Sequence, residues 1–539
     1  MGFTPTSSNN AVGRELASVL PQDNKGWYQR AHLVKLNLII LSLCQFSSNN
    51  GFDGSIMNGL QSLPLWHEFM HTPTGAWLGF INAIFFLGMI VCAPIASEVS
   101  NNYGRKRSVW IGYVFIVVGV ALQTAAPNDK AFIVARLLIG GSSAFFSNSV
   151  PLLINEIAYP THRGIVSAIF YTGFYVGSII AACATFGTRN YGNSWAWRVP
   201  SLLQILLPIV ALPGFWYCPE SPRFLIDKGH IEEARRIIST FHAGDDDNSP
   251  LVNYEMQEIE TAIAAEKTAK HSSSYADMSR TKGNRWRLAI TVSLAIFSQW
   301  SGNGVVSYYL SLVLTTVGIT GVTDQLLINL GLQIWNLIFS VAAAFSVDKL
   351  GRRVLFLVSA GTMLISYVVV TGLSGSFAQT GHSATGIAVV PFLFCFFAGY
   401  DIALTPLLLA YTCEIWPYTL RTKGITVMWV TAISAIFFNT FVNPIALEAI
   451  GWKYYIVFVV VLIIFCITAY LFYPETRGHS LERMAVIFEG VDAADMELEQ
   501  TKERAVSVSH ETSAGIAAKT NTVYHEKKGA SNPGSLQEI

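Results

Sequence analysis

The chain has 539 residues, of which 52% are apolar and only 13% are charged, and its formal net charge at pH 7 is zero. Soluble domains carry roughly 25% charged residues, so this composition, with a mean hydropathy of +0.42, excludes a soluble protein for most of the chain. The zero net charge gives no support to a nucleic-acid or acidic partner. The lipid bilayer is the expected surrounding.

Windows of about 20 apolar residues predict transmembrane helices. The predicted spans are 33–52, 77–97, 108–126, 131–154, 165–187, 199–218, 288–312, 326–347, 354–374, 386–412, 423–446 and 454–473. Such long apolar segments satisfy their backbone hydrogen bonds in hydrocarbon as helices. The expected fold is therefore an all-α integral membrane protein with twelve transmembrane helices in two six-helix halves.

The two halves carry the same charged motifs in the same order. Gly104-Arg105-Lys106 returns as Gly351-Arg352-Arg353, and Pro219-Glu220-Ser221 returns as Pro474-Glu475-Thr476. Copies of this kind are related by an axis along the membrane normal and place a site between them near the midplane. This arrangement predicts a transporter. The domains are 1–32, an N-terminal segment; 33–218 and 288–473, the halves; 219–287, a loop; and 474–539, a tail.

Lys and Arg gather in the connections after the second, fourth, sixth, eighth and tenth spans, which predicts that these loops and both termini face the cytoplasm. Residues 1–30 lack the pattern of a cleavable signal peptide, so the first span is expected to direct insertion. The apolar spacing of residues 231–238 predicts a helical cytoplasmic loop. The polar tail from about residue 490 is expected to be disordered, either simply solvated or with a regulatory or docking role.

The seven cysteines show no metal-ligand spacing, and no catalytic motif is present. We therefore expect no metal, no cofactor and no enzymatic activity.

Two ionisable residues within or beside predicted spans suggest proton coupling. Asp53 lies at the far end of the first span, and Arg136 lies near the start of the fourth, toward the external side of the same half. A carboxylate facing a guanidinium can take up a proton and release its partner. The alternative is a static interfacial Asp and an Arg that snorkels from a helix end.

Charged residues at the cytoplasmic ends of the helices predict a gate. Glu156 can pair with Arg105 or Arg163, and Glu414 with Arg352 or Arg421, to hold the halves together in one state. The alternative is topology signalling with helix capping. The predicted gate consists of Arg105, Glu156, Arg163, Glu220, Arg352, Glu414, Arg421 and Glu475.

The seventh span contains residues suited to a polyhydroxylated ligand. Gln299, Asn303 and Tyr308 fall at i, i+4 and i+9, near one helix face, where amides and a ring can meet a sugar. Packing between helices is the alternative. Tyr171 and Asn439 are weaker candidates for sugar contacts.

On these residues the chain resembles the sugar porter family of the major facilitator superfamily over about residues 33–485. The motifs that carry the resemblance are Tyr103 to Arg107, Arg136 with Glu156, Pro219 to Arg223, Leu350 to Arg353 and Pro474 to Gly478. Within that family it is similar to fungal lactose and cellodextrin permeases, through 297–310 and 404–415. The resemblance implies that Asp53 and Arg136 form a proton-coupling pair and that Gln299 binds sugar.

Several residues depart from the pattern of hexose porters. This chain has Ser298, Gly304 and Leu409 where those proteins carry a second glutamine, an asparagine and a tryptophan, and Tyr171 where they carry a glutamine. Smaller residues widen a cavity, which suits a disaccharide. Asn101 replaces the acidic residue that usually precedes the first Gly-Arg turn, which implies a weaker gate.

The expected function is proton-coupled uptake of a sugar, such as lactose or cellobiose, by a monomer in the plasma membrane. The expected partners are the sugar, the proton and the bilayer. Two alternatives remain, a sugar sensor that does not transport and an exporter of a glycosylated or other small metabolite.

Overall fold

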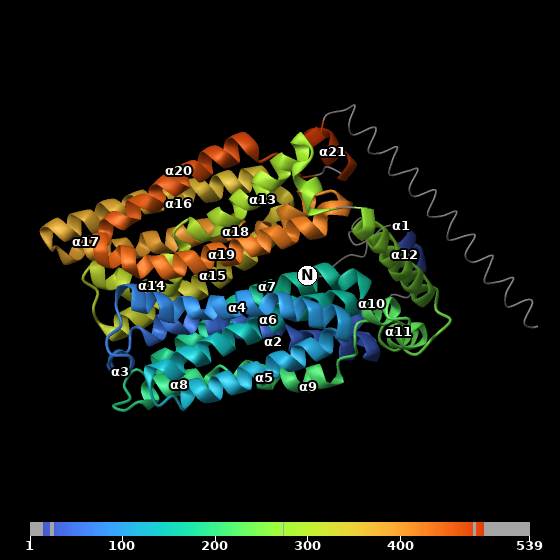
Figure 1. Cartoon of the computed structure of the whole chain (residues 1–539), viewed down its shortest axis with the longest axis horizontal. Helices are drawn as coiled ribbons and strands as arrows, with labels where there is room; N and C mark the ends of the chain where they lie inside the picture. Colours follow the sequence, from blue (N-terminus) through green and yellow to red (C-terminus); the bar gives the residue numbers. More distant parts are fainter. Residues whose placement is uncertain (1–13, 22–25, 273, 478–480, 490–539) are drawn as a thin grey trace, which may run out of the picture.

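Every regular element of the described residues is helical. The computed structural model describes residues 14–21, 26–272, 274–477 and 481–489. The first half consists of α2 (Ala31–Leu60), α4 (Gly75–Tyr103), α5 (Arg105–Thr124), α6 (Asp129–Ile157), α7 (Arg163–Thr188), α8 (Trp195–Leu203) and α9 (Leu206–Tyr217). The second half consists of α13 (Lys282–Trp300), α14 (Asn303–Thr316), α15 (Val322–Leu350), α16 (Arg352–Thr380), α18 (Val389–Ile415), α19 (Tyr418–Ile450) and α20 (Tyr455–Phe472). Figure 1 shows the halves as two bundles side by side.

These helices confirm the twelve predicted spans, with two spans each built from two consecutive helices. The sixth span is α8 followed by α9, and the seventh is α13 followed by α14. By length and hydropathy, ten segments of the described chain meet the requirements of a membrane span, and one of them, Thr419–Phe472, contains both α19 and α20. The broken seventh span is not among the ten, because neither of its pieces is both long and apolar enough.

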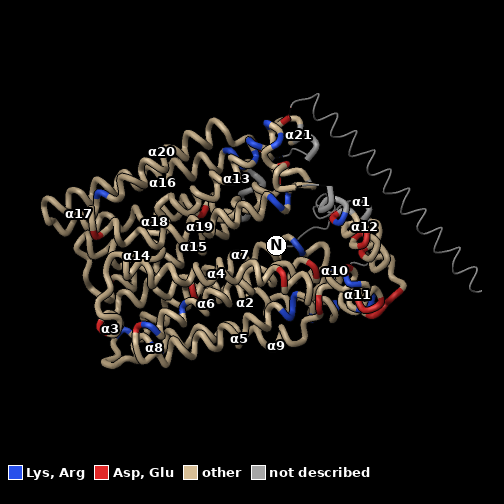
Figure 2. Tube along the Cα trace, viewed as in Figure 1, with Lys and Arg blue, Asp and Glu red and all other residues tan. Residues whose placement is uncertain are grey.

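Short elements mark the two ends of the molecule. One end carries α10 (Pro222–Asp227), α11 (Ile231–Ile238) and α12 (Pro250–Ser272), and we call it the α11 end; the other carries α3 (Pro64–Phe69) and α17 (Ser383–Ile387), and we call it the α3 end. Charged residues concentrate at the α11 end, whereas the middle of the bundle is almost free of them (Figure 2). This distribution fits a bilayer around the middle.

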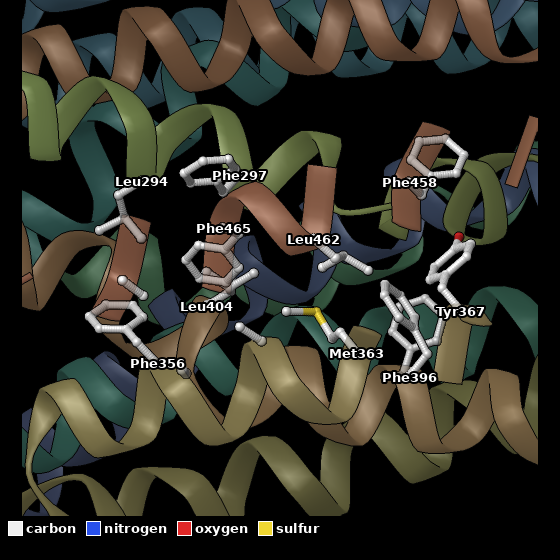
Figure 3. Packing of buried hydrophobic residues seen from close by; sticks show 14 of the residues in the cluster. Leu294, Phe297, Phe356, Met363, Tyr367, Phe396, Leu404, Phe458, Leu462 and Phe465 are labelled. Carbon is white, nitrogen blue, oxygen red and sulfur yellow. The ribbon is translucent and has the colours of Figure 1, made fainter. Parts of the chain in front are cut away.

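The second half has one continuous apolar core. Side chains from α13, α16, α18 and α20 interdigitate there (Figure 3). The labelled members are Leu294, Phe297, Phe356, Met363, Tyr367, Phe396, Leu404, Phe458, Leu462 and Phe465. In lipid, such helices are held together by close packing rather than by removal of apolar surface from water.

The first half relies on glycines where α2 crosses α7. A Cβ atom at Gly177 would lie 1.7 Å from the main-chain oxygen of Ser48, and one at Gly51 would lie 1.8 Å from that of Phe174. Small residues of this kind let two membrane helices approach closely.

Replacing Gly177 with alanine should therefore separate α2 from α7. We expect a loss of at least about 1–3 kcal/mol of stability, the usual cost of overpacking, seen as a lower Tm of the purified protein in detergent. Gly187→Ala is the matched control, because Gly187 lies on the same helix with no atom near its Cβ position. Equal melting of the two variants would contradict the packing argument.

The loop between the halves folds onto the first half. Leu225, Ala234 and Met256 form a small core of α10, α11 and α12. His242 Nδ1 lies 2.8 Å from Glu255 Oε2, and its Nε2 lies 3.1 Å from the main-chain oxygen of Ile157 at the end of α6. This buried pair attaches the loop to a membrane helix.

Two further α-helices of the described residues are α1 (Arg14–Val19) and α21 (Leu481–Glu489). Glu489 of α21 accepts a hydrogen bond from Arg287 of α13 at 2.9 Å, so the start of the predicted tail packs against the second half. The part of the tail predicted to be disordered, from about residue 490, lies outside the described residues.

Candidate functional site

Asp53 and Arg136 meet inside the first half. The prediction that Asp53 lies at the far end of its span is wrong, because α2 continues to Leu60 and places Asp53 within the helix. Polar residues such as Asn49 and Asn58 lower the hydropathy of this stretch, but their side chains are buried in protein and do not end the helix.

The contacts of Asp53 leave one buried carboxylate oxygen without a hydrogen-bond partner among the described residues. Asn49 Nδ2 donates to Asp53 Oδ2 at 2.9 Å, and Asp53 Oδ1 has no hydrogen-bond partner in the described part of the chain. Arg136 Nη1 donates to the main-chain oxygen of Asp53 at 3.1 Å, and the guanidinium lies 4.8 Å from the centre of the Phe85 ring. The carboxylate and the guanidinium are thus neighbours that interact electrostatically.

The seventh span is broken, which overturns the prediction that Gln299, Asn303 and Tyr308 share one helix face. Gly302 adopts φ +103° between α13 and α14, a conformation that favours glycine. Tyr367 donates to the main-chain oxygen of Gly302 at 2.7 Å and holds the break. Residues after the break therefore point in directions that helical spacing does not give.

The structure brings Gln299 and Asn439 together. Asn439 Nδ2 donates to the main-chain oxygen of Gln299 at 2.7 Å, and the Gln299 side chain donates to Ser298 Oγ at 3.1 Å. The amide N–H of Asn439 therefore stabilises the end of α13, as the packing alternative for this residue expects. Asn303, in the first turn of α14, has a buried Oδ1 with no hydrogen-bond partner among the described residues.

Tyr308 lies between the halves. Its ring packs edge-on against Phe86 of α4 at 5.4 Å, and its main-chain oxygen accepts from Gln61 Nε2 at 2.9 Å. Tyr171, on α7, is 46% exposed and lies one turn before Tyr175. These two predicted tyrosines therefore occupy different environments.

The halves are joined by hydrogen bonds at the α3 end. Asn58 of α2 donates to the main-chain oxygen of Ser307 at 2.5 Å and accepts from the N–H of Leu310 at 3.0 Å. Arg189, after α7, donates to Thr323 of α15 at 3.3 Å. These contacts hold α2 and α7 against α14 and α15.

The predicted gate pairs form within the halves. Arg105 binds Glu156 through two hydrogen bonds of 3.0 and 3.1 Å, and Arg352 binds Glu414 at 2.9 Å. The expectation that these pairs link the halves is not met in this conformation, because each pair joins two helices of a single half. Arg163 instead donates to the main-chain oxygen of Ala158 at 3.4 Å.

Arg421 also differs from its expected pairing. Its Nε and Nη2 are buried without hydrogen-bond partners in the part of the chain that the structure describes. Glu414 is instead engaged by Arg352 and by Thr476 Oγ1.

Glu220 and Glu475 close the equivalent turns of the two halves. Glu220 accepts from the main-chain N–H groups of Arg105 and Lys106, both at 3.1 Å, at the start of α5. Glu475 accepts in the same way from the first residues of α16, at 2.8 and 3.0 Å. A carboxylate at a helix N-terminus satisfies free N–H groups and complements the helix dipole.

The two turns differ in their electrostatics. Burial raises the pKa of Glu220 above its ordinary value, although main-chain N–H donors oppose it. Burial acts in the same direction on Glu475, but main-chain N–H donors outweigh it and bring the pKa of Glu475 below its ordinary value. As pH falls, Glu220 therefore gains a proton before Glu475 does.

A second buried carboxylate, which sequence reasoning missed, lies in α18. Asp401 is fully buried and accepts a hydrogen bond from Tyr175 of α7 at 2.5 Å. The signal was present in the sequence, because Asp401 is an acidic residue inside a long apolar span, and such residues are expensive in lipid. Its partner on the other half was not predictable from spacing.

Residues 38–488 match the family described as Sugar (and other) transporter. The chain belongs to this sugar transporter family. The high-affinity glucose transporter of Kluyveromyces lactis is 26% identical to it over 477 residues, which are 84% of this chain and 85% of that relative.

Solved structures show the fold of this sugar transporter. The inward-open xylose transporter XylE from E. coli matches with a TM-score of 0.70 and 21% identity, over 84% of this chain and 100% of that one. XylE bound to 6-bromo-6-deoxy-D-glucose, described as a proton:xylose symporter of the major facilitator superfamily, matches with a TM-score of 0.66 and 21% identity, over 85% and 99%. The predicted major facilitator fold is confirmed.

Family membership also confirms that the protein is a multi-pass membrane transporter for sugars rather than an enzyme. In this sugar transporter, α2, α6 and α7 of the first half carry the buried residues Asp53, Arg136 and Tyr175. The second half contributes the break between α13 and α14, together with α18. Tyr175 and Asp401 meet between the halves, whereas Asp53 and Arg136 meet within the first half.

Proposed function

We propose that this transporter takes up a sugar together with a proton, by alternating access between its two halves. The observation that carries the proposal is the buried Asp53 carboxylate, which has one open oxygen and an arginine beside it. A carboxylate in this position binds a proton when the site opens to the outside and releases it when the site opens to the opposite side. After release and before the next uptake, Arg136 stabilises the charged carboxylate of Asp53.

The hydrogen bonds at the α3 end support an inward-facing conformation. In this proposal the α11 end and both termini face the cytoplasm, as the Lys and Arg distribution predicts, and the transporter is a monomer in the plasma membrane. The contacts of Asn58 and Arg189 with the second half close the external side. Opening that side requires these contacts to break.

The gate acts through the charge pairs at the α11 end. Arg105–Glu156 and Arg352–Glu414 fix helix ends within each half, so each half moves as a unit. When the external side opens, the charge pair of the first half approaches the charge pair of the second half. Charged side chains of one half can then interact with those of the other. Partly wet charges of this kind supply a modest bias between states.

The sugar binds beside the break between α13 and α14, and a disaccharide is the proposed substrate. Gln299 ends α13, and Asn303 begins α14 with a buried, unpartnered oxygen that suits a sugar hydroxyl. Ser298 and Leu409 are smaller than the residues that the resemblance to hexose porters leads one to expect, whereas Asn439 occupies the space beside Gly304. The relatives named above transport glucose or xylose, so the larger ligand rests on Ser298 and Leu409.

Uptake of labelled lactose, cellobiose and glucose in transport-deficient cells tests the proposal. We expect a disaccharide to accumulate, and a protonophore to abolish its accumulation. Leu409→Trp should reduce disaccharide uptake far more than glucose uptake, because it restores a large ring in the space proposed for the second sugar unit. Uptake indifferent to the protonophore indicates a facilitator, and absence of uptake by protein that reaches the membrane favours the sensor or the exporter.

A further inference from the structure

Asp401 lies near the middle of α18, in the half that does not contain Asp53. It is 12 residues from the start of α18 at Val389 and 14 from the end at Ile415, and Tyr175 is similarly central in α7. Asp53 lies on α2 of the first half, which contacts the same part of α7, because Ser178 donates to the main-chain oxygen of Gly51 at 3.1 Å. The two carboxylates therefore belong to different halves and have different partners.

The contacts of Asp401 come from both halves. Tyr175 Oη of the first half donates to Asp401 Oδ1 at 2.5 Å, and Thr405 Oγ1 of the second half donates to the same oxygen at 2.8 Å. Asp401 Oδ2 is buried and has no hydrogen-bond partner among the described residues. Oδ1 thus links the two halves, whereas Oδ2 has no hydrogen-bond partner among the described residues.

The titratable groups that face Asp401 are phenols. Tyr175 approaches from α7 and Tyr400 from α18 itself, while Tyr308 of α14 interacts in turn with Tyr400. The Tyr400 hydroxyl donates a hydrogen bond to the main-chain oxygen of Ser298 on α13. The described parts of α13, α15, α16 and α19 add no charged side chain to this group.

A carboxylate at this depth without a cation is costly while it is charged. Two hydroxyl donors stabilise the charged form only in part, and the open Oδ2 can bind a proton, which neutralises the group. The charged form accepts a stronger hydrogen bond from Tyr175 than the neutral form does, because hydrogen bonds to ionised acceptors are shorter and stronger. The proton on Oδ2 therefore weakens a contact that joins the halves.

We propose that Asp401 is a second proton-binding residue of the transporter, and that its protonation controls the Tyr175–Asp401 contact between the halves at the midplane. The link to transport rests on the proposed function, whereas proton binding itself does not. The proton comes from water, adds to Oδ2 without breaking a covalent bond, and leaves the same oxygen when the site is charged again.

Infrared difference spectra of purified protein in lipid, recorded as a function of pH, test proton binding directly. We expect the carbonyl band of a protonated carboxylic acid to be present in Asp53→Asn and lost when Asp401→Asn is added. In Tyr175→Phe, which keeps both carboxyls and removes one donor, one component of the band should persist to higher pH than in the wild type. A band that is the same with and without Asp401 overturns the proposal.

Counterflow of sugar in proteoliposomes, without a pH gradient, tests the coupling. In Asp53→Asn we expect exchange that still depends on pH, and in Asp53→Asn with Asp401→Asn a loss of that remaining dependence. A higher KM for the sugar in Asp401→Asn with an unchanged pH profile overturns the proposal and makes Asp401 a sugar ligand instead. If the wild type exchanges none of the sugars, the proposed function fails, and the infrared titration alone decides whether Asp401 binds a proton.

Discussion

Replacing Asp53 with asparagine should abolish the accumulation of sugar while leaving sugar exchange intact. Asparagine keeps the shape of the side chain but neither binds nor releases a proton. Sugar transport is then no longer coupled to the movement of a proton. One proton that moves down about 100 mV provides about 2.3 kcal/mol, which supports an accumulation ratio of roughly 50-fold. In Asp53→Asn we expect a ratio near one.

The measurement compares concentrative uptake with counterflow in the same membranes. Asn49→Ala is the control, because it removes the side-chain amide that donates to Asp53 but keeps the carboxyl group. This variant should still accumulate sugar, with a changed pH dependence. Full accumulation by Asp53→Asn would place the coupling elsewhere, and loss of counterflow together with accumulation would indicate a structural role for Asp53.

Replacing Gln299 with alanine should weaken sugar binding without uncoupling transport. Each hydrogen bond between an amide and a sugar hydroxyl is worth about 0.5–1.5 kcal/mol, so the loss of two should raise KM roughly 5- to 150-fold. The accumulation ratio at saturating sugar should stay near that of the wild type, because Asp53 and Arg136 are untouched.

Ser298→Ala separates contact from positioning at this site. Ser298 is buried and accepts a hydrogen bond from the Gln299 side chain, so it orients the glutamine from within the protein. We expect a smaller rise in KM than in Gln299→Ala. KM is measured from initial rates of uptake over a range of sugar concentrations. If KM is unchanged in Gln299→Ala, Gln299 has only a packing role.

Long apolar segments and the duplicated motifs determined most of the fold in advance. A helix is the stable form of an apolar stretch of about 20 residues in lipid, so the spans follow from local composition, and the repeat around Glu220 and Glu475 identified two equivalent halves. Asp53 and Arg136 were recognisable because charges are rare within such spans. In all these cases the informative property belongs to the residues themselves.

Tertiary structure alone decided which polar groups meet and where the helices bend. The break at Gly302 depends on Tyr367, which is far away in the sequence and holds the exposed main-chain oxygen. Arg105 pairs with Glu156 inside one half, because the packing of α5 on α6 aligns them. Asp401 finds Tyr175 only because α7 and α18 face each other across the interface. Composition and spacing report what a helix contains, but a contact between two helices depends on their relative rotation and depth, which only the packed structure sets.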